Sequence, residues 1–153
     1  MSTRDQYCTF YADGLFFGVE VLRVQEVMRY LEMTPVPLAS PTVRGLINLR
    51  GQIVTALDLR QRLELPPRSG ENQPMNVIIR SEDGAISLLV DEIGDVVEVE
   101  ESTHEIPPET LRGPARELVV GVYKLKGQLL LTLDVEKLIS LPLVRAHRAT
   151  AAA

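Results

Sequence analysis

The stretch that decides the fold is GLINLRGQIVTALDL, residues 45–59, because GVYKLKGQLLLTLDV at residues 121–135 is a second version of it. The two stretches are related by a constant shift of 76, and the similarity continues to residues 65 and 141. Over these 21 positions seven pairs are identical, among them the glycines at 51 and 127 and the aspartates at 58 and 134. A pattern that recurs at a fixed shift is typical of a duplicated structural unit. The sequence therefore predicts two copies of one unit, over about residues 7–65 and 75–141.

Each copy also carries an Asp-Gly pair between two apolar segments, at residues 13–14 and 83–84. This pair is a strong signal for a β-hairpin, because a type I′ turn needs positive φ at both central residues. Gly51 and Gly127 are predicted to occupy further hairpin turns for the same reason. Short apolar runs broken by glycine and proline, ten of each, favour strands over helices. We predict a mainly β protein with short helices, in which each copy forms a small barrel.

The middle segments of the two copies differ. In the first copy Val21, Val24, Met28 and Leu31 recur at helical spacing, which predicts at least a short helix. In the second copy the valines near residue 97 indicate an extended segment. Residues 91–109 of that copy hold eight acidic side chains and no lysine or arginine, a pattern more typical of a solvated face than of a docking surface.

Composition limits the possible functions of the 153-residue chain. One cysteine excludes an internal disulfide, and with only two histidines it provides no zinc-type cluster, so no metal or other cofactor is expected. The formal net charge of −5 argues against a nucleic-acid partner. The apolar runs are far shorter than the roughly 20 residues that span a bilayer. We expect a cytoplasmic protein that is not inserted in a membrane.

Catalytic candidates are weak. Cys8 lies in an apolar segment, where a free cysteine usually acts as a small buried hydrophobe. Asp58 and Asp134 each follow an apolar strand and precede a helical pattern, so helix capping is a better interpretation than a catalytic carboxylate pair. No glycine-rich phosphate-binding motif is present. The sequence predicts a binding protein that is not an enzyme and has no small-molecule substrate.

Arg50, at a predicted tight hairpin, is a candidate for binding. Its planar guanidinium could clamp a carboxylate of a partner, or it could be an ordinary solvated turn residue. Glu26 has a similar default interpretation, an intrahelical partner such as Arg23 or Arg29. Val24 is most simply a core residue.

The chain resembles the CheW-like family of chemotaxis coupling proteins over about residues 5–141. Four segments in the family's order support the resemblance: VEVLRVQEV at 19–27, VRGLINLRGQIVTALDL at 43–59 after Pro35 and Pro41, LVDEIGDV at 89–96, and LLTLDVEKL at 130–138. The resemblance implies one domain over residues 5–141, built of two five-stranded SH3-like barrels around a shared hydrophobic seam and open to an exchange of strands. Residues 142–153 are expected to form a flexible or helical tail.

The resemblance also implies a function. Such proteins are non-catalytic adaptors that connect the cytoplasmic tip of methyl-accepting chemoreceptors to the regulatory domain of a histidine autokinase, in arrays at the membrane. Kinase contacts would lie on apolar edges of the barrels. The family's receptor-facing positions, carried over onto this sequence, are Val24, Glu26, Gly45, Arg50, Gly51, Ile93 and Val96. On that basis Val24 would be an exposed apolar contact, and Glu92 departs from the small residue that is common at its position.

Two alternatives remain at this level. The same fold could serve a related pathway that controls pilus motility or a nucleotide second messenger. A small-barrel nucleic-acid-binding protein is the other, and it would need a basic face with interleaved aromatic side chains. The chain has only four tyrosines, three phenylalanines and no tryptophan, which disfavours that interpretation.

Overall fold

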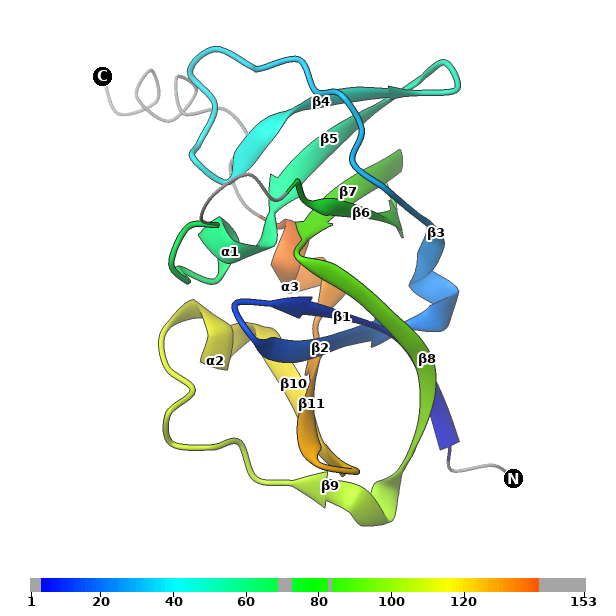
Figure 1. Cartoon of the computed structure of the whole chain (residues 1–153), viewed down its shortest axis with the longest axis vertical. Coiled ribbons are helices and arrows are strands. Elements are labelled where there is room, and N and C mark those ends of the chain that lie inside the picture. The colour runs from blue at the N-terminus through cyan, green and yellow to red at the C-terminus, as the bar shows by residue number, and fades with distance from the viewer. Residues whose placement is uncertain (1–3, 69–72, 83, 141–153) are drawn as a thin grey trace.

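The computed structural model describes residues 4–68, 73–82 and 84–140 (Figure 1). Eleven strands lie within them: β1 Arg4–Ala12, β2 Leu15–Glu20, β3 Val24–Met28, β4 Val43–Leu49, β5 Gln52–Asp58, β6 Met75–Ser81, β7 Gly84–Val90, β8 Glu92–Glu100, β9 His104–Glu105, β10 Val119–Leu125 and β11 Gln128–Leu133. The helices are short: α1 Leu59–Arg62, α2 Pro114–Leu118, α3 Val135–Ile139, and the 3-10 turns η1 Val21–Arg23 and η2 Glu101–Thr103. The prediction of a mainly β protein with short helices is confirmed. Asp83 and the predicted tail at 142–153 lie outside the described residues.

The strands form two sheets, stacked one above the other in Figure 1. The upper sheet has five strands in the order β3-β6-β7-β5-β4, and the lower sheet has six in the order β8-β1-β2-β11-β10-β9. Parallel pairing of β5 with β7 and of β2 with β11 joins hairpins from the two sequence copies. Each sheet therefore contains strands of both copies.

The duplicated stretch forms the same local structure twice. The hairpin β4–β5 leads into α1, and the hairpin β10–β11 leads into α3. Asp58 caps α1 by accepting a hydrogen bond from the backbone N–H of Arg60 at 3.0 Å, and Asp134 caps α3 through the N–H of Lys137 at 3.2 Å. These contacts confirm the capping interpretation, since a side-chain oxygen satisfies an N–H that has no partner within the helix.

The hairpin turns also have the predicted backbone. Gly51 and Gly127 have φ values of 87° and 81°, and Asp13 and Gly14 have 52° and 76°. Positive φ at both residues of the latter pair is the type I′ geometry, whose twist matches that of the flanking strands.

The helix predicted around residues 21–31 is wrong beyond its first turn. Only η1 is helical, and β3 follows it with alternating burial. β3 pairs antiparallel with β6, Val24 opposite Ile79 and Met28 opposite Asn76. Because Val24 and Met28 are four residues apart, they share one face in a strand as well as in a helix, so their spacing could not separate the two.

Backbone contacts beyond the strands join the edges of each sheet. Thr34 and Leu46 exchange N–H···O bonds of 2.9 and 2.8 Å, which connect the segment after β3 to the edge strand β4. At Gly45 a Cβ would lie 2.7 Å from the carbonyl oxygen of Thr34, so this approach requires glycine. In the lower sheet η2 connects the edge strands β8 and β9 directly.

The largest hydrophobic cluster lies between the sheets and is shared by them. Phe10 and Phe17 enter it from the lower sheet, and Val77 and Leu88 enter it from the upper sheet. Smaller clusters lie within each barrel, around Ile47 in the upper one and around Tyr123 in the lower one. Among residues 4–68, 73–82 and 84–140, no helix is long and apolar enough to span a membrane.

Candidate functional site

Apart from Gly45, which lies on β4, the predicted receptor-facing residues lie on β3, the β4–β5 turn and β8, and these elements share the right-hand side of the molecule in Figure 1. The contact that joins two of these elements is an ion pair in which Arg50 Nη2 donates to Glu26 Oε2. The Arg50 side chain is 64% exposed and that of Glu26 is 26% exposed. The turn itself is held by a bond from the Gly51 N–H to Asn48 Oδ1 at 2.9 Å. Arg50 is therefore an accessible cation on a rigid turn.

This pairing differs from the default interpretation of Glu26. A helical segment would have paired Glu26 with Arg23 or Arg29, whereas Arg23 donates to Glu136 Oε2 at 2.5 Å and to the carbonyl oxygen of Arg80 at 3.1 Å. The register of β3 against β6 shifts between Val24 and Glu26. Since β3 is a strand, Glu26 finds its partner across the barrel instead of along a helix.

The remaining predicted site residues differ in exposure. Val96 is 55% exposed. Val24 and Ile93 are half-buried and pack against the shared core, so neither stands out as an exposed apolar contact. Gly45 is buried and serves the close approach of Thr34 described above. The structure thus exposes Arg50, Gly51 and Val96, leaves Glu26, Val24 and Ile93 half-buried, and buries Gly45.

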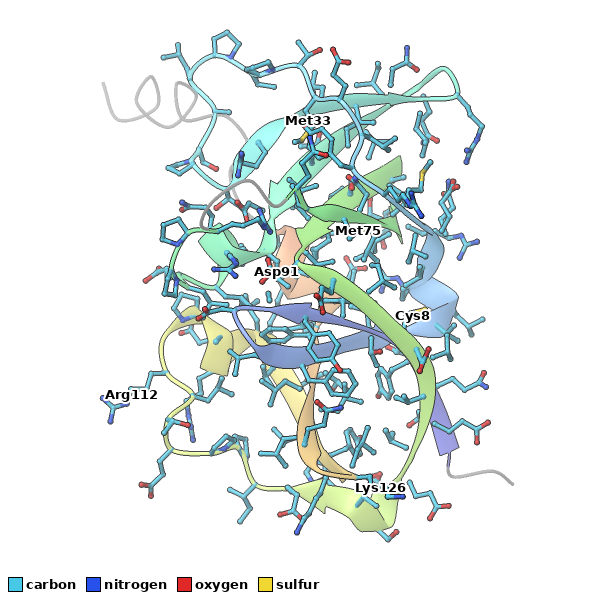
Figure 2. All side chains as sticks on the ribbon, in the orientation of Figure 1. Cys8, Met33, Met75, Asp91, Arg112 and Lys126 are labelled. Atoms are coloured by element: carbon cyan, nitrogen blue, oxygen red, sulfur yellow. The ribbon has the colours of Figure 1, made fainter. Side chains whose placement is uncertain are left out.

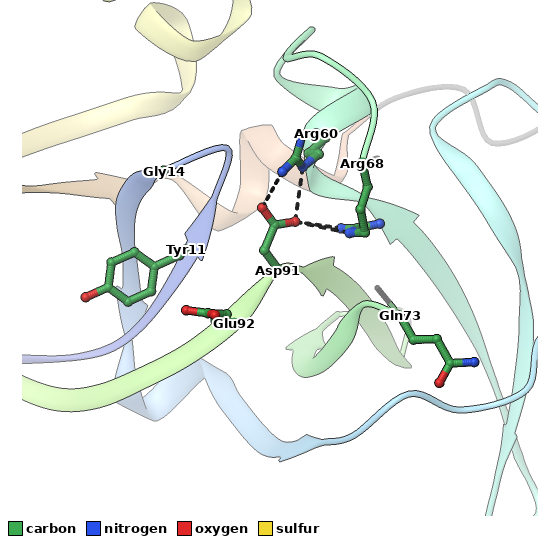
Figure 3. Close-up of a pocket in the computed structure, with 7 residues that line it drawn as sticks. All are labelled: Tyr11, Gly14, Arg60, Arg68, Gln73, Asp91 and Glu92. Atoms are coloured by element: carbon green, nitrogen blue, oxygen red, sulfur yellow. Dashed lines mark hydrogen bonds and ion pairs between the residues drawn. The ribbon is translucent and has the colours of Figure 1, made fainter. Parts of the chain in front are cut away.

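A second polar cluster, which sequence analysis missed, is centred on Asp91 between β7 and β8 (Figure 3). Arg60 donates to both carboxylate oxygens, Nε to Oδ1 at 3.0 Å and Nη2 to Oδ2 at 2.6 Å. Arg68 donates to Oδ1 from Nε at 3.1 Å and from Nη2 at 3.0 Å. The backbone N–H of Asp13, in the β1–β2 turn, donates to Oδ2 at 2.8 Å. Figure 2 places Asp91 at the level where the two sheets meet, so the cluster ties one sheet to the other.

The electrostatics of the Asp91 cluster indicate a structural role. Burial by itself raises the pKa of Asp91. The hydrogen bonds from Arg60, the Asp13 N–H and Arg68 lower that pKa by more than burial raises it, so the pKa lies below its usual value. The cluster borders a pocket of about 470 Å³ that Glu92 also lines. Two arginines and two carboxylates leave no excess charge there, so the pocket lacks the electrostatics of an anion-binding site.

Other reactive groups are positioned for structural roles. Burial raises the pKa of the Cys8 thiol, which keeps it in its weakly nucleophilic form. Asp58 is occupied by its cap and by Arg44 Nη1 at 2.9 Å. In the part of the chain that the structure describes, no group of three or more His, Cys, Asp or Glu side chains is arranged to hold a metal ion.

Comparison with known proteins identifies the family. The family model for the CheW-like domain matches residues 6–142. The chain belongs to the CheW-like family. Among curated relatives, the chemotaxis protein CheW of Bacillus subtilis is 30% identical over 134 residues, covering 88% of this chain and 86% of the relative. The CheW protein of Treponema pallidum is 28% identical over 139 residues, covering 88% and 82%.

A solved structure confirms the fold. The scaffolding protein TtCheW from Thermoanaerobacter tengcongensis superposes with a TM-score of 0.78 at 23% identity, covering 90% of this chain and 93% of that one. Membership of the CheW-like family gives the protein a chemotaxis adaptor or scaffold role. The family is one of non-catalytic scaffolds.

This CheW-like chain also exposes apolar side chains at equivalent positions of its two copies. Ile53 on β5 is 61% exposed, and Leu129 on β11, its partner in the repeat, is 36% exposed. Each lies one residue after the start of the second strand of its hairpin. Both positions carry a large apolar residue at the exposed start of a strand, before its buried positions begin.

Proposed function

We propose that this protein couples chemoreceptors to a histidine autokinase in the cytoplasm, and that it catalyses no reaction itself. The observation that carries the proposal is the match to the CheW-like family over nearly the whole chain. The receptor-facing surface in this proposal comprises Glu26, Arg50, Gly51 and Val96, together with the less exposed Val24, Gly45 and Ile93. The Arg50–Glu26 pair supports this assignment, since it brings two of the residues together.

Arg50 suits the recognition of a carboxylate on a receptor helix. A guanidinium has five N–H donors in a planar fork, and Glu26 accepts from Nη2. An exposed ion pair contributes only about 0–1 kcal/mol, so exchange of Glu26 for a partner's carboxylate costs little. Val27 and Val96, 45% and 55% exposed, offer apolar contact on β3 and β8, two strands that lie on the same side of the molecule in Figure 1.

The kinase would pack against the apolar hairpin faces that include Ile53 and Leu129. Because these positions are equivalent in the two copies, each barrel would offer the same kind of contact to a regulatory domain that is itself built of barrels. Single contacts of this size are weak, and an array of partners raises the effective concentration of each one. A signal would reach the kinase because the assembly stabilises the different states of the kinase to different extents.

A three-component assay tests the proposal. Kinase autophosphorylation is measured with receptor-containing vesicles, with and without this protein, and we expect receptor control only when the protein is present. Arg50→Glu should weaken that control, whereas Arg112→Glu, the same change at an exposed position on the opposite side in Figure 2, should not. Kinase activity that ignores the receptor in the presence of the unaltered protein contradicts the proposal.

A further inference from the structure

The segment between β3 and β4 contains an unusual turn. The Ala39 N–H donates to the carbonyl oxygen of Val36 at 3.3 Å, with Pro37 and Leu38 at the two central positions. Leu38 has a φ of 62°. Proline followed by a residue with positive φ is the pattern of a type II turn, whose second central residue is usually glycine or asparagine. The turn therefore carries a bulky branched side chain where the backbone favours a small residue.

Leu38 differs from the other non-glycine residues of positive φ. Asp13 and Arg50 lie in hairpin turns, each before a glycine, and Glu64 follows the end of α1. Among the residues that the structure describes, Leu38 is the apolar member of this group, and it is 67% exposed. The left-handed conformation is unfavourable for leucine because its Cβ approaches the following carbonyl oxygen. An isolated exposed leucine needs no explanation, but an exposed leucine in a strained backbone points to a function.

Both ends of this segment are held in place. Thr34 is joined to Leu46 by the two backbone bonds described above, and the carbonyl oxygen of Thr42 accepts from the Asp58 N–H at 2.8 Å. Three prolines between residues 35 and 41 restrict the backbone further, since each one fixes its own φ. The leucine is therefore presented on a pre-ordered turn, and little conformational freedom is lost when a partner binds it.

The segment also lacks charge. Residues 33–43 contain no charged side chain, although 24% of the residues of the chain are charged. The central part of a protein–protein interface is depleted of charged residues, because their desolvation is costly. A nucleic acid or a small anion would instead require lysine or arginine side chains at its binding site. The chemistry of this segment therefore fits an apolar pocket on a folded protein.

The position of the segment indicates which protein. In Figure 1 the chain leaves β3 on the right-hand side, runs over the top of the upper sheet and reaches the left-hand side before β4 begins. The proposed receptor-facing surface lies on the right-hand side, on β3, the β4–β5 turn and β8. A receptor bound there leaves the far part of the segment accessible. Because an adaptor has to hold two partners at once, the second partner is the one that this segment suits.

We propose that Leu38 is an apolar anchor that inserts into an apolar pocket of the histidine autokinase. The inference rests on the proposed function and adds one contact to the apolar hairpin faces at Ile53 and Leu129. A glycine at position 38 would relieve the backbone strain and remove the contact. Stability and kinase binding should therefore respond to that change in opposite directions, which a residue needed only for folding would not show.

Calorimetric titration of the full chain with the full-length kinase, together with thermal melting, tests the anchor. Leu38→Gly should weaken binding roughly tenfold, as expected for an interface anchor, while Tm stays the same or rises. Leu38→Asn, a polar residue that tolerates the same backbone, should weaken binding similarly, and Leu38→Met should keep most of the affinity. The control is Ile106→Ala, which truncates an apolar side chain that is 87% exposed beside the lower sheet and should leave binding unchanged.

Three results overturn the anchor. Equal kinase affinity for Leu38→Gly and the unaltered chain does so and leaves the proposed function standing. A fall in Tm that accompanies weaker binding assigns Leu38 to folding instead. Weaker binding of Leu38→Gly to receptor-containing vesicles, with kinase affinity unchanged, assigns the segment to the receptor. A kinase that does not bind the unaltered chain is a separate outcome, because it removes the proposed function and the anchor with it.

Discussion

Replacing Asp91 by asparagine tests whether the Asp91 cluster joins the two sheets. The asparagine has the same shape and keeps an oxygen that can accept from the Asp13 N–H, but it removes the charge that Arg60 and Arg68 share. Both arginine side chains are largely buried, 13% and 10% exposed. The substitution therefore leaves two poorly solvated cations next to each other, with the more distant and more exposed carboxylate of Asp13, 3.8 Å from Arg60, as the remaining counter-ion.

The size of the effect follows from this burial. Breaking a fully buried pair costs about 3–5 kcal/mol and an exposed one contributes about 0–1 kcal/mol. With Asp91 itself 19% exposed, we expect the free energy of unfolding to fall by about 2–3 kcal/mol. For a chain of this length each kcal/mol lowers Tm by about 2–4 °C, so Tm should fall by about 4–12 °C.

Urea denaturation and thermal melting measure the loss, with Glu92→Gln as the matched control. Glu92 is the next residue and is exposed, so the same loss of charge there should change stability by less than about 0.5 kcal/mol. The pKa of Asp91 is lowered in the folded protein, so its stabilisation is complete above the unfolded pKa of about 3.9 and is lost as pH falls below that value. The curves of stability against pH for the unaltered protein and for Asp91→Asn should therefore converge only in acid. A loss below about 0.5 kcal/mol for Asp91→Asn, or a loss that matches Glu92→Gln, refutes the structural role.

Four further substitutions separate surface roles from backbone roles. Arg50→Glu replaces the ion pair with Glu26 by two like charges in an exposed position, so it should lower stability by at most about 1 kcal/mol while weakening receptor control; a large drop in Tm would assign Arg50 to folding instead. Gly51→Val and Gly127→Val should each cost about 1–3 kcal/mol from backbone strain alone, because open space surrounds both positions, and unchanged melting would contradict the turn assignment. Gly45→Ala should cost more than either, because its Cβ would lie 2.7 Å from a backbone carbonyl, and a smaller loss in urea denaturation would contradict the close contact.

Local features of the fold could be predicted from the sequence. The type I′ turn at residues 13–14 and the caps at Asp58 and Asp134 each depend on a side chain and a backbone only a few residues apart. Such short-range constraints give the same sequence pattern wherever they occur. The capping aspartate appears in both copies of the repeat, so the sequence shows its pattern twice. The error at β3 shows the limit, since a spacing of four residues fits both periodicities and only the pairing with β6 decides between them.

Long-range features left no comparable signal. The parallel pair of β2 and β11 joins residues more than a hundred positions apart, and nothing in either strand specifies that partner. Asp91 stands at the start of an acidic run that lacks basic residues, which favoured the interpretation of a solvated face. Its partners precede it by 31 and 23 positions, Arg60 on α1 and Arg68 in the segment that follows α1. The composition of a segment cannot report an ion pair whose other half lies elsewhere in the sequence.

The exchange of strands also bears on how the proposed adaptor function could transmit a signal. Glu26 and Arg50 belong to the upper sheet, whereas Val96 belongs to the lower one, so a receptor that touched all three, as the proposed function requires, would span the junction. The shared core and the Asp91 cluster hold that junction at two places, one by apolar packing and one by charge. A loosened junction would let the two halves of the surface move independently, and binding would then have to restore their alignment at a cost in affinity. Loss of receptor control in Asp91→Asn, at a temperature where the variant remains folded, is the outcome that this argument requires.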